Sequence, residues 1–269
     1  MGIKFSVCLV GVNSRPCTYQ NRSNRMPDPA AAVDENAIRR RIEEVRERVE
    51  QACQRAGRDA SEVTLIGVSK TFALRYVDAA REAGLRDFAE NRVQDLEEKA
   101  EQLPGAHAGG PVNWHFVGHL QRNKVKTAIK YCDTFHALDS PRLARELEKR
   151  LERIDRTLPV FVQVNVSGEE SKYGLPPSRL HEYLDSLAEY DHLRVRGLMT
   201  IASLVDDPEE VRPEFRLLRD LYDRYDDHDN PSVELEALSM GMTNDFEVAI
   251  EEGATHLRVG RAIFGPRDA

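Results

Sequence analysis

Residues 63–70 read VTLIGVSK, an almost uninterrupted apolar run that ends in Lys70. The density of apolar residues, of which Val63, Ile66 and Val68 are β-branched, predicts a strand over 63–70. The run leads into neither a GxGxxG nor a GxxxxGK[ST] motif. The first turn of the fold therefore lacks the glycine-rich phosphate loop that is typical of nucleotide-binding open sheets.

Seven further apolar runs follow, and helical patterns alternate with them. The predicted strands are 86–90, 114–119, 134–138, 159–166, 194–201, 234–239 and 256–263. Helices are predicted at 74–83, 92–102, 121–131 and 244–252, and others open at Ser140-Pro141 and Asp207-Pro208. Eight strands alternating with helices predict a single (β/α)₈ TIM-type barrel of the α/β class, which closes at eight strands. A doubly wound open sheet is the alternative.

An additional helix precedes the first strand. Apolar residues recur at helical spacing from Ile38 to Ala52, and Gly57 supplies a stop signal. We therefore divide the chain into an N-terminal extension, residues 1–33, and a barrel domain with an extra N-terminal helix, residues 34–269. The first 25 residues hold basic but no acidic side chains, and we expect a disordered extension or a start site at Met26. A signal peptide is disfavoured because no small-x-small cleavage site follows the apolar run 5–12.

Composition limits the function classes. The chain of 269 residues is 41% hydrophobic and 31% charged with a formal net charge of −8, which argues against a nucleic-acid-binding surface. No stretch of 18 apolar residues is present to span a membrane. The four cysteines show no CxxC spacing, so we expect neither disulfides nor a zinc site, and a cytoplasmic location. The acidic run 223–229 is typical of a solvated helix end or loop, although its carboxylates could hold a cation weakly.

Lys70 is the sharpest candidate for chemistry. The carboxyl ends of barrel strands carry the active site, and a lysine there lies in the barrel mouth, where desolvation lowers its pKa. A lysine of this kind can form a Schiff base with an aldehyde or ketone. The alternative is a lysine whose stem lies along the strand end while its ammonium reaches solvent.

The last two strands end in groups suited to phosphate. Ser239 and Thr243 bracket Gly241 at the start of a helix, and Gly260-Arg261 follows the eighth strand. Barrels commonly bind phosphate at these two loops through hydroxyls, backbone N–H groups and a helix N-terminus. Tight turns and an N-cap at Thr243 are the alternative reading of the same residues.

A phosphate site beside a Schiff-base lysine indicates a phosphorylated aldehyde, either pyridoxal phosphate or the substrate of a sugar-phosphate aldolase. Arg258, an arginine inside an apolar strand, needs an internal partner: a pyridine nitrogen, which would stay unprotonated, or a core carboxylate in a structural ion pair. His115 and His136 lie in the middle of strands, and we expect them to be packed and hydrogen-bonded rather than catalytic.

Six stretches, taken together and in order, carry a family resemblance. They are GVSKT (67–71), ENRVQ (90–94), WHFVGHLQRNK (114–124), RGLMTI (196–201), LSMGM (238–242) and VGRAIFG (259–265). From about residue 34 to the C-terminus the chain resembles the pyridoxal phosphate homeostasis proteins, whose barrel is similar to the N-terminal domain of alanine racemase.

The resemblance implies a role for each matching residue. Lys70 would carry pyridoxal phosphate as a Schiff base, Arg258 would face the pyridine nitrogen, and Asn91 would line the pocket. The residues Ser239, Thr243, Gly260 and Arg261 would bind the phosphate. Lys172, in the stretch ESKYG (170–174), matches a family lysine near the mouth that affects cofactor exchange.

The resemblance further implies a non-catalytic protein that acts in intracellular vitamin B6 homeostasis, with effects on amino-acid pools. Apo-enzymes that use pyridoxal phosphate are expected recipients, and we expect a monomer or weak dimer. A cofactor-dependent racemase is the alternative, but it needs two bases, and Lys70 supplies one. In alanine racemase the second base is a tyrosine on a C-terminal domain. We expect this chain to lack that domain, because it ends four residues after Gly265. Tyr173 or a histidine would then have to replace that tyrosine.

Overall fold

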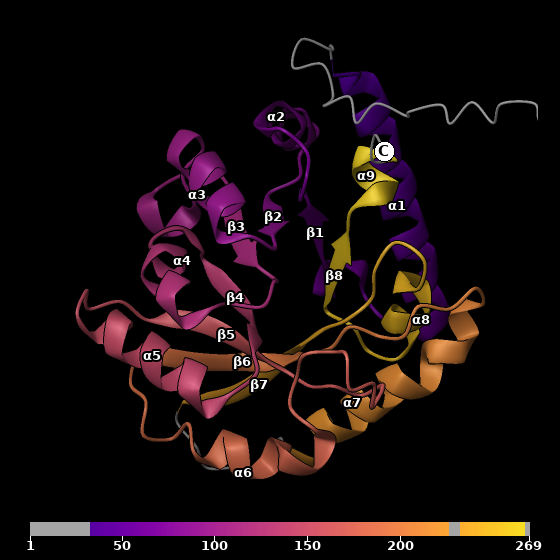
Figure 1. The fold of residues 1–269 in the computed structure, drawn as a ribbon. Coiled ribbons are helices and arrows are strands. Elements are labelled where there is room, and N and C mark those ends of the chain that lie inside the picture. Colours follow the sequence, from indigo (N-terminus) through magenta and orange to yellow (C-terminus); the bar gives the residue numbers. More distant parts are fainter. Residues whose placement is uncertain (1–32, 226–231, 267–269) are drawn as a thin grey trace, which may run out of the picture. The chain divides into compact units, whose positions relative to one another are not determined.

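Eight parallel strands close into a barrel in the computed structural model, which describes residues 33–225 and 232–266 (Figure 1). The strands are β1 Thr64–Val68, β2 Asp87–Glu90, β3 Asn113–Phe116, β4 Thr134–Leu138, β5 Leu158–Gln163, β6 Leu193–Met199, β7 Val233–Ser239 and β8 His256–Val259. Each strand pairs with the next along the chain, and β8 pairs with β1 from Thr64↔His256 to Gly67↔Val259. The predicted (β/α)₈ barrel is confirmed, and the open-sheet alternative is wrong.

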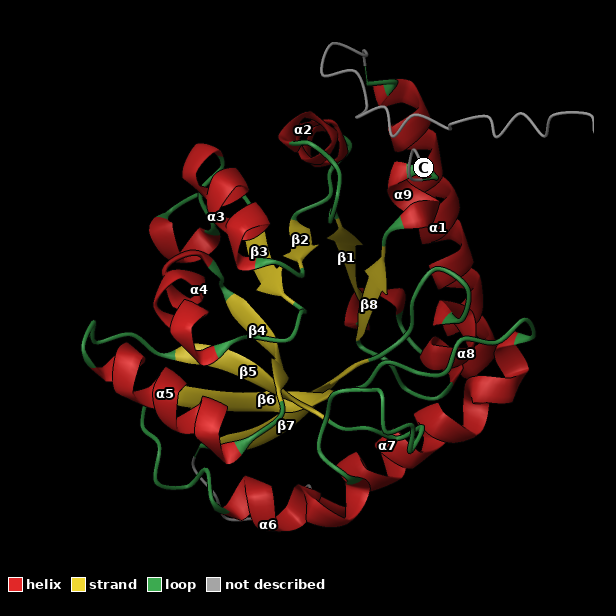
Figure 2. Cartoon of the chain, viewed as in Figure 1, coloured by secondary structure: helices red, strands yellow, loops and turns green. Residues whose placement is uncertain are grey.

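Helices cover the outside of the barrel (Figure 2). They are α1 Glu35–Ala56, α2 Leu74–Glu82, α3 Val93–Gln102, α4 Val125–Tyr131, α5 Pro141–Glu152, α6 Leu180–Asp185, α7 Arg212–Tyr225, α8 Phe246–Glu251 and α9 Arg261–Phe264. The sequence predicted no helix at α6. That helix has only six residues after a 3₁₀ turn at Pro177–Arg179, which is too short to show a 3.6-residue period.

The extra N-terminal helix is confirmed as α1. The Asp34 side chain accepts a hydrogen bond from the Ala37 N–H at 2.9 Å, and Gly57 ends the helix in the left-handed region at φ 66°. Its buried face packs against α2, α8 and α9. Because α9 is only one turn long, α1 supplies the long helical cover beside β8 and β1.

Several strands end earlier than the sequence predicted, because the chain turns outward toward the next helix. The first strand ends at Val68, so Lys70 lies in the turn that follows β1 rather than on the strand. The eighth ends at Val259 instead of Ile263, since the Ile263 and Phe264 N–H groups both donate to the Gly260 carbonyl and begin α9. These shorter strands leave the polar rim residues in loops around the barrel mouth.

Two expectations fall largely outside the described residues. The predicted extension, residues 1–33, is described only at Val33, and the acidic run is described only as far as Tyr225. Within that run, Asp223 forms an ion pair with Arg219 on α7 at 2.8 Å. Over 33–225 and 232–266, no helix is both long and apolar enough to cross a membrane, and no cluster of His, Cys, Asp or Glu side chains is suited to a metal ion.

Candidate functional site

A cavity of about 890 Å³ opens at the carboxyl ends of the strands, within the size range of small-molecule sites. The structure brings most of the predicted site residues to its wall: Lys70, Asn91, Lys172, Thr243, Arg258, Gly260 and Arg261. Ser239 is not among the lining residues. The loop 201–205 also lines the cavity, which the sequence gave no reason to expect.

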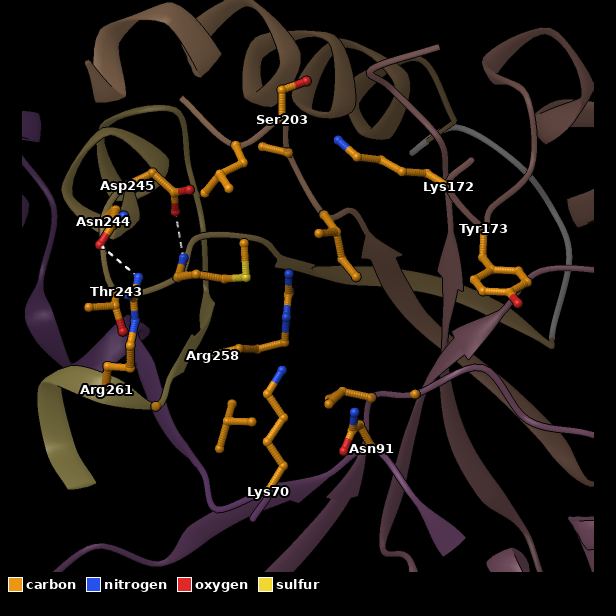
Figure 3. A pocket seen from close by; sticks show the side chains of 18 of the residues that line it. Lys70, Asn91, Lys172, Tyr173, Ser203, Thr243, Asn244, Asp245, Arg258 and Arg261 are labelled. Carbon is orange, nitrogen blue, oxygen red and sulfur yellow. Dashed lines mark hydrogen bonds between the residues drawn. The ribbon is translucent and has the colours of Figure 1, made fainter. Parts of the chain in front are cut away.

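Lys70 reaches into this cavity from the turn after β1. Its side chain points toward Arg258, which lies on the neighbouring strand β8 (Figure 3). The Ser69 N–H donates to the Ala89 carbonyl at 3.1 Å, so the chain is tied to β2 immediately before the lysine. Thr71, immediately after it, has φ 72°, an unfavourable conformation for a β-branched residue. Such local strain is common at ligand sites, where the surrounding structure holds it in place.

Arg258 lies at the base of the cavity and is 5% exposed. Its guanidinium donates to the Ser239 Oγ at 2.7 Å and to the Thr200 carbonyl at 2.6 Å. Burial lowers the pKa of Arg258 to about 10, while the Asp245 carboxylate acts in the opposite direction. These two hydrogen-bond acceptors are neutral oxygens, so the buried guanidinium is not held by direct pairing with a core acid.

The loop between β7 and α8 shapes one side of the cavity. Gly241 has φ 91°, and a Cβ there would lie 2.7 Å from the Ala249 Cβ, so the turn requires glycine. The Asp245 carboxylate accepts the Met242 N–H at 2.6 Å and fixes the loop. Thr243 lies on this loop, near Arg261 (Figure 3). A hydroxyl and a guanidinium on one wall suit an anion.

Asp245 is a wall residue that the sequence analysis missed. It is 6% exposed, and burial raises the pKa of its carboxyl. The adjacent Asn244 accepts a long hydrogen bond from Arg261 at 3.5 Å. The position immediately before α8 was the available signal, because Asp is favoured at helix starts and organises backbone N–H groups there.

The opposite wall carries Lys172 and Tyr173 (Figure 3). The Lys172 ammonium pairs with the Glu169 carboxylate at 2.5 Å, and hydrogen bonds from Lys172 and Ser203 lower the pKa of Glu169. The Tyr173 ring is stacked on His119 with centroids 4.0 Å apart, and Tyr173 is 57% exposed. Tyr173, the tyrosine considered as a second base, therefore lies at the open side of the cavity.

Ser239, the remaining predicted site residue, is fully buried beneath Arg258. Its hydroxyl contacts the Arg258 guanidinium and, at 2.9 Å, the His136 Nδ1. His136 in turn lies 2.9 Å from His115, and both histidines are buried. The expectation that these histidines are packed and hydrogen-bonded is confirmed.

Behind Lys70 lies a buried ion pair that the sequence analysis also missed. The Lys99 ammonium pairs with the Glu90 carboxylate and donates to the Ser69 carbonyl at 2.9 Å. The Ser69 hydroxyl donates to the same carboxylate at 2.6 Å. Burial raises the pKa of Glu90, and the Lys99 ammonium offsets this only in part. The available signal was a lysine at an apolar position of α3, in phase with Val93 and Leu96.

The side chains on this wall fit a phosphorylated, ring-bearing aldehyde. Lys70 offers an amine for a carbonyl carbon, Thr243 and Arg261 offer donors for a phosphate, and Arg258 offers a fixed guanidinium for a ring acceptor. Thr243 and Arg261 lie together, while Lys70 and Arg258 lie deeper in the same cavity (Figure 3). One small molecule with a carbonyl and a phosphate can reach all of these groups.

Comparisons with known proteins identify the family of the chain. The family model described as "Alanine racemase, N-terminal domain" matches residues 33–268. The pyridoxal phosphate homeostasis protein of Aquifex aeolicus (strain VF5) is 43% identical over 227 residues, 84% of this chain and 97% of the relative. That of Escherichia coli (strain K12) is 36% identical over 233 residues, 87% and 98% of the two chains.

Among solved structures, PipY of Synechococcus elongatus PCC7942 with PLP bound has a TM-score of 0.72 at 31% identity, with 85% of this chain and 100% of PipY covered. The same protein without PLP has a TM-score of 0.74 at 32% identity. These likenesses extend over the whole barrel. The chain belongs to the pyridoxal phosphate homeostasis protein family, within the group defined by the alanine racemase N-terminal domain.

Proposed function

We propose that this protein binds pyridoxal 5′-phosphate as a Schiff base on Lys70 and acts in intracellular vitamin B6 homeostasis, with effects on amino-acid pools. The observation that carries the proposal is the shared cavity in which the Lys70 side chain points toward Arg258 while Thr243 and Arg261 lie together on one wall. The PLP-bound relative PipY supports it.

Each wall residue has a distinct role in this proposal. Thr243 and the Gly260-Arg261 segment bind the phosphate, and Asn91 lines the ring pocket. Arg258 donates to the pyridine nitrogen, which keeps that nitrogen unprotonated and weakens the cofactor as an electron sink. Lys172 affects cofactor exchange at the open side. Ser239 was expected to bind phosphate, but its hydroxyl already bonds to Arg258, so we assign it to the support of that arginine.

A carrier fits the wall better than an enzyme does. Racemisation needs a second base facing Lys70, and Tyr173, the available tyrosine, is stacked on His119 at the open side. The curated relatives carry a homeostasis name rather than an enzyme name. We therefore propose a cytoplasmic monomer or weak dimer that holds the cofactor for apo-enzymes that use it.

Catalytic exchange is the measurement that separates the two classes. Incubation of the loaded protein with L-alanine in deuterated water should give no incorporation at Cα beyond the rate of free pyridoxal phosphate, because racemisation needs a second base and Tyr173 is stacked on His119 at the open side. Proton NMR of the amino acid measures the exchange. Rapid exchange that is lost in both Lys70→Ala and Tyr173→Phe would instead establish a racemase-like enzyme.

The phosphate wall can be tested with a ligand that lacks the phosphate. We expect pyridoxal to bind about a hundredfold more weakly than pyridoxal phosphate, and Thr243→Val to reduce that ratio about tenfold, since a hydrogen bond to a charged group contributes roughly 1.5–3 kcal/mol. Absorbance titration gives both dissociation constants. Thr134→Val, a threonine on β4 away from the cavity wall, is the control and should leave the ratio unchanged. An unaltered ratio in Thr243→Val would remove Thr243 from the phosphate site.

A further inference from the structure

A chain of hydrogen bonds crosses the barrel interior beneath the cavity. Arg258 donates to the Ser239 Oγ at 2.7 Å, and that oxygen lies 2.9 Å from the His136 Nδ1. The His136 Nε2 lies 2.9 Å from the His115 Nδ1, and the His115 Nε2 lies 3.1 Å from the Asp87 Oδ1. The chain thus joins β8, β7, β4, β3 and β2.

The two ends of this hydrogen-bond chain line different cavities. Arg258 lines the cavity at the carboxyl ends of the strands, while Asp87 is the first residue of β2. Asp87 lines a second cavity of about 420 Å³ together with Thr64, the first residue of β1. A residue on the wall of the second cavity is therefore connected to the ligand site through side chains alone.

The end groups fix the direction of the hydrogen bonds. An arginine can only donate, so the Ser239 oxygen accepts, and the hydroxyl hydrogen remains available for the His136 Nδ1. At the other end, burial opposes ionisation of Asp87, but hydrogen bonds from His115 and Asn113 outweigh it and lower the pKa of that carboxyl. An ionised carboxylate can only accept, so His115 donates through Nε2.

A neutral His115 then accepts at Nδ1 from the His136 Nε2–H, and the His136 Nδ1 accepts the Ser239 hydroxyl. Burial holds the pKa of His136 well below its usual range, and the Arg258 guanidinium acts in the same direction. If the bonds between the histidines and Ser239 ran the other way, His115 would donate through both ring nitrogens and carry a positive charge. A second buried charge in the same network as the Arg258 guanidinium is costly.

Packing holds the rings of this chain in place. The His136 ring is stacked on Phe161, with centroids 4.3 Å apart and planes 12° apart. His256 contacts both rings edge-on, and burial lowers the pKa of His256 to about 4, so it adds no charge at neutral pH. With the rings fixed, Ser239 has one position in which it satisfies both of its neighbours.

We propose that this chain positions the Arg258 guanidinium for the ligand ring, and that its members are the positioning residues Asp87, His115, His136 and Ser239. Asp87 thereby influences the ligand site from the wall of the second cavity. The inference rests on the proposed function for the identity of the ligand, but the chain itself is a property of the free protein. It also gives a role to the buried side chains of His115, His136 and Ser239.

The first test needs no ligand. In protein labelled with ¹⁵N-histidine, the imidazole correlation spectrum of the ligand-free protein should show His115 and His136 as neutral Nε2–H tautomers. Asp87→Asn and Ser239→Ala should each shift the ring nitrogens of both histidines, since they remove the two ends of one chain. A charged His115 with an Nδ1–H tautomer at His136 would overturn the proposal, as would shifts confined to the nearer ring.

The second test measures the affinity for pyridoxal phosphate. Asp87→Asn and Ser239→Ala should each raise Kd about five- to tenfold, as expected for a charged hydrogen bond that is partly lost. The double variant should lose no more than the larger single loss, because both changes break the same chain. The controls are Asp133→Asn, a partly buried carboxylate paired with His107, and Ser232→Ala, a buried hydroxyl bonded to the Tyr190 carbonyl. Both controls should stay within about twofold of the parent.

The outcomes separate the two proposals. If the unaltered protein binds no pyridoxal phosphate while the predicted tautomers are present, the proposed function fails. The hydrogen-bond chain is then present, but it does not position Arg258 for this ligand. If binding is tight but the chain variants match their controls, or the double loss equals the sum of the single losses, the positioning role is refuted and the proposed function survives.

Discussion

Borohydride reduction of the protein loaded with pyridoxal phosphate should fix one cofactor per chain on Lys70, and Lys70→Ala should lose that label. Reduction converts a lysine Schiff base to a stable secondary amine, so peptide mapping identifies the attachment site. The lysine reaches into the cavity toward Arg258, and Thr243 and Arg261, the proposed phosphate ligands, line the same cavity. Loss of the covalent link should raise the dissociation constant about a hundredfold, which corresponds to about 2.7 kcal/mol.

The control for this experiment is the second lysine of the same cavity. Lys172 pairs with Glu169 at the open side, so Lys172→Ala should keep one label per chain on Lys70 and alter the exchange rate of the cofactor. A label that maps to Lys172 in the unaltered protein, or full occupancy with an unchanged affinity in Lys70→Ala, would contradict the assignment. Because both variants change an exposed or half-buried lysine, neither is expected to unfold the chain.

The fold was predictable because each barrel strand is a local apolar run. The pattern over 63–70 and its seven counterparts predicted the number and order of the strands, since strand count alone separates a closed barrel from an open sheet. The ends of the strands were less predictable. At Gly260-Arg261 the apolar pattern continues into Ile263, yet the backbone becomes helical there, because apolar residues on a single helical turn look like those on a strand.

The site was predictable where one residue carries the signal. A lysine or an arginine at the end of an apolar strand is conspicuous, and Lys70 and Arg258 both line the cavity. Ser239 illustrates the limit of this approach. Because it is close to Gly241 in the sequence, we expected it to bind phosphate, but on β7 its side chain is buried in the barrel interior. Contacts between distant segments, such as Ser239 with His136, leave no trace in a single sequence.

The largest effect on stability is expected from Lys99→Met. The Lys99 ammonium is the partner of the Glu90 carboxylate in a site where Glu90 is fully buried, and one carboxylate oxygen, Oε2, has no hydrogen-bond partner among the described residues. Removal of one member of a buried ion pair leaves the other charge uncompensated and typically costs about 3–5 kcal/mol of the free energy of unfolding. Urea denaturation of the free protein measures the loss.

A surface pair provides the control for that loss. Arg179 and Glu182 form an ion pair at 2.9 Å, but both side chains are mostly exposed, so Arg179→Met should cost about 0.5 kcal/mol or less. The pH dependence is a second check. In Lys99→Met the pKa of Glu90 is raised further, and a raised pKa in the folded state means stability that is present at low pH and lost as the pH rises. The deficit against the parent protein should therefore be larger at pH 8 than at pH 5.

The double variant Lys99→Met/Glu90→Gln distinguishes stability from the positioning of Lys70. With the lone charge removed, most of the lost stability should return, because a buried pair can be replaced by neutral groups at little net cost. The Ser69 carbonyl, however, loses its bond to the Lys99 ammonium, and Ser69 directly precedes Lys70. We therefore expect a protein that is nearly as stable as the parent but binds pyridoxal phosphate about tenfold more weakly, the effect of a charged hydrogen bond lost next to the lysine. An affinity that recovers together with the stability would show that the pair serves only the fold, and that the turn after β1 holds Lys70 without it.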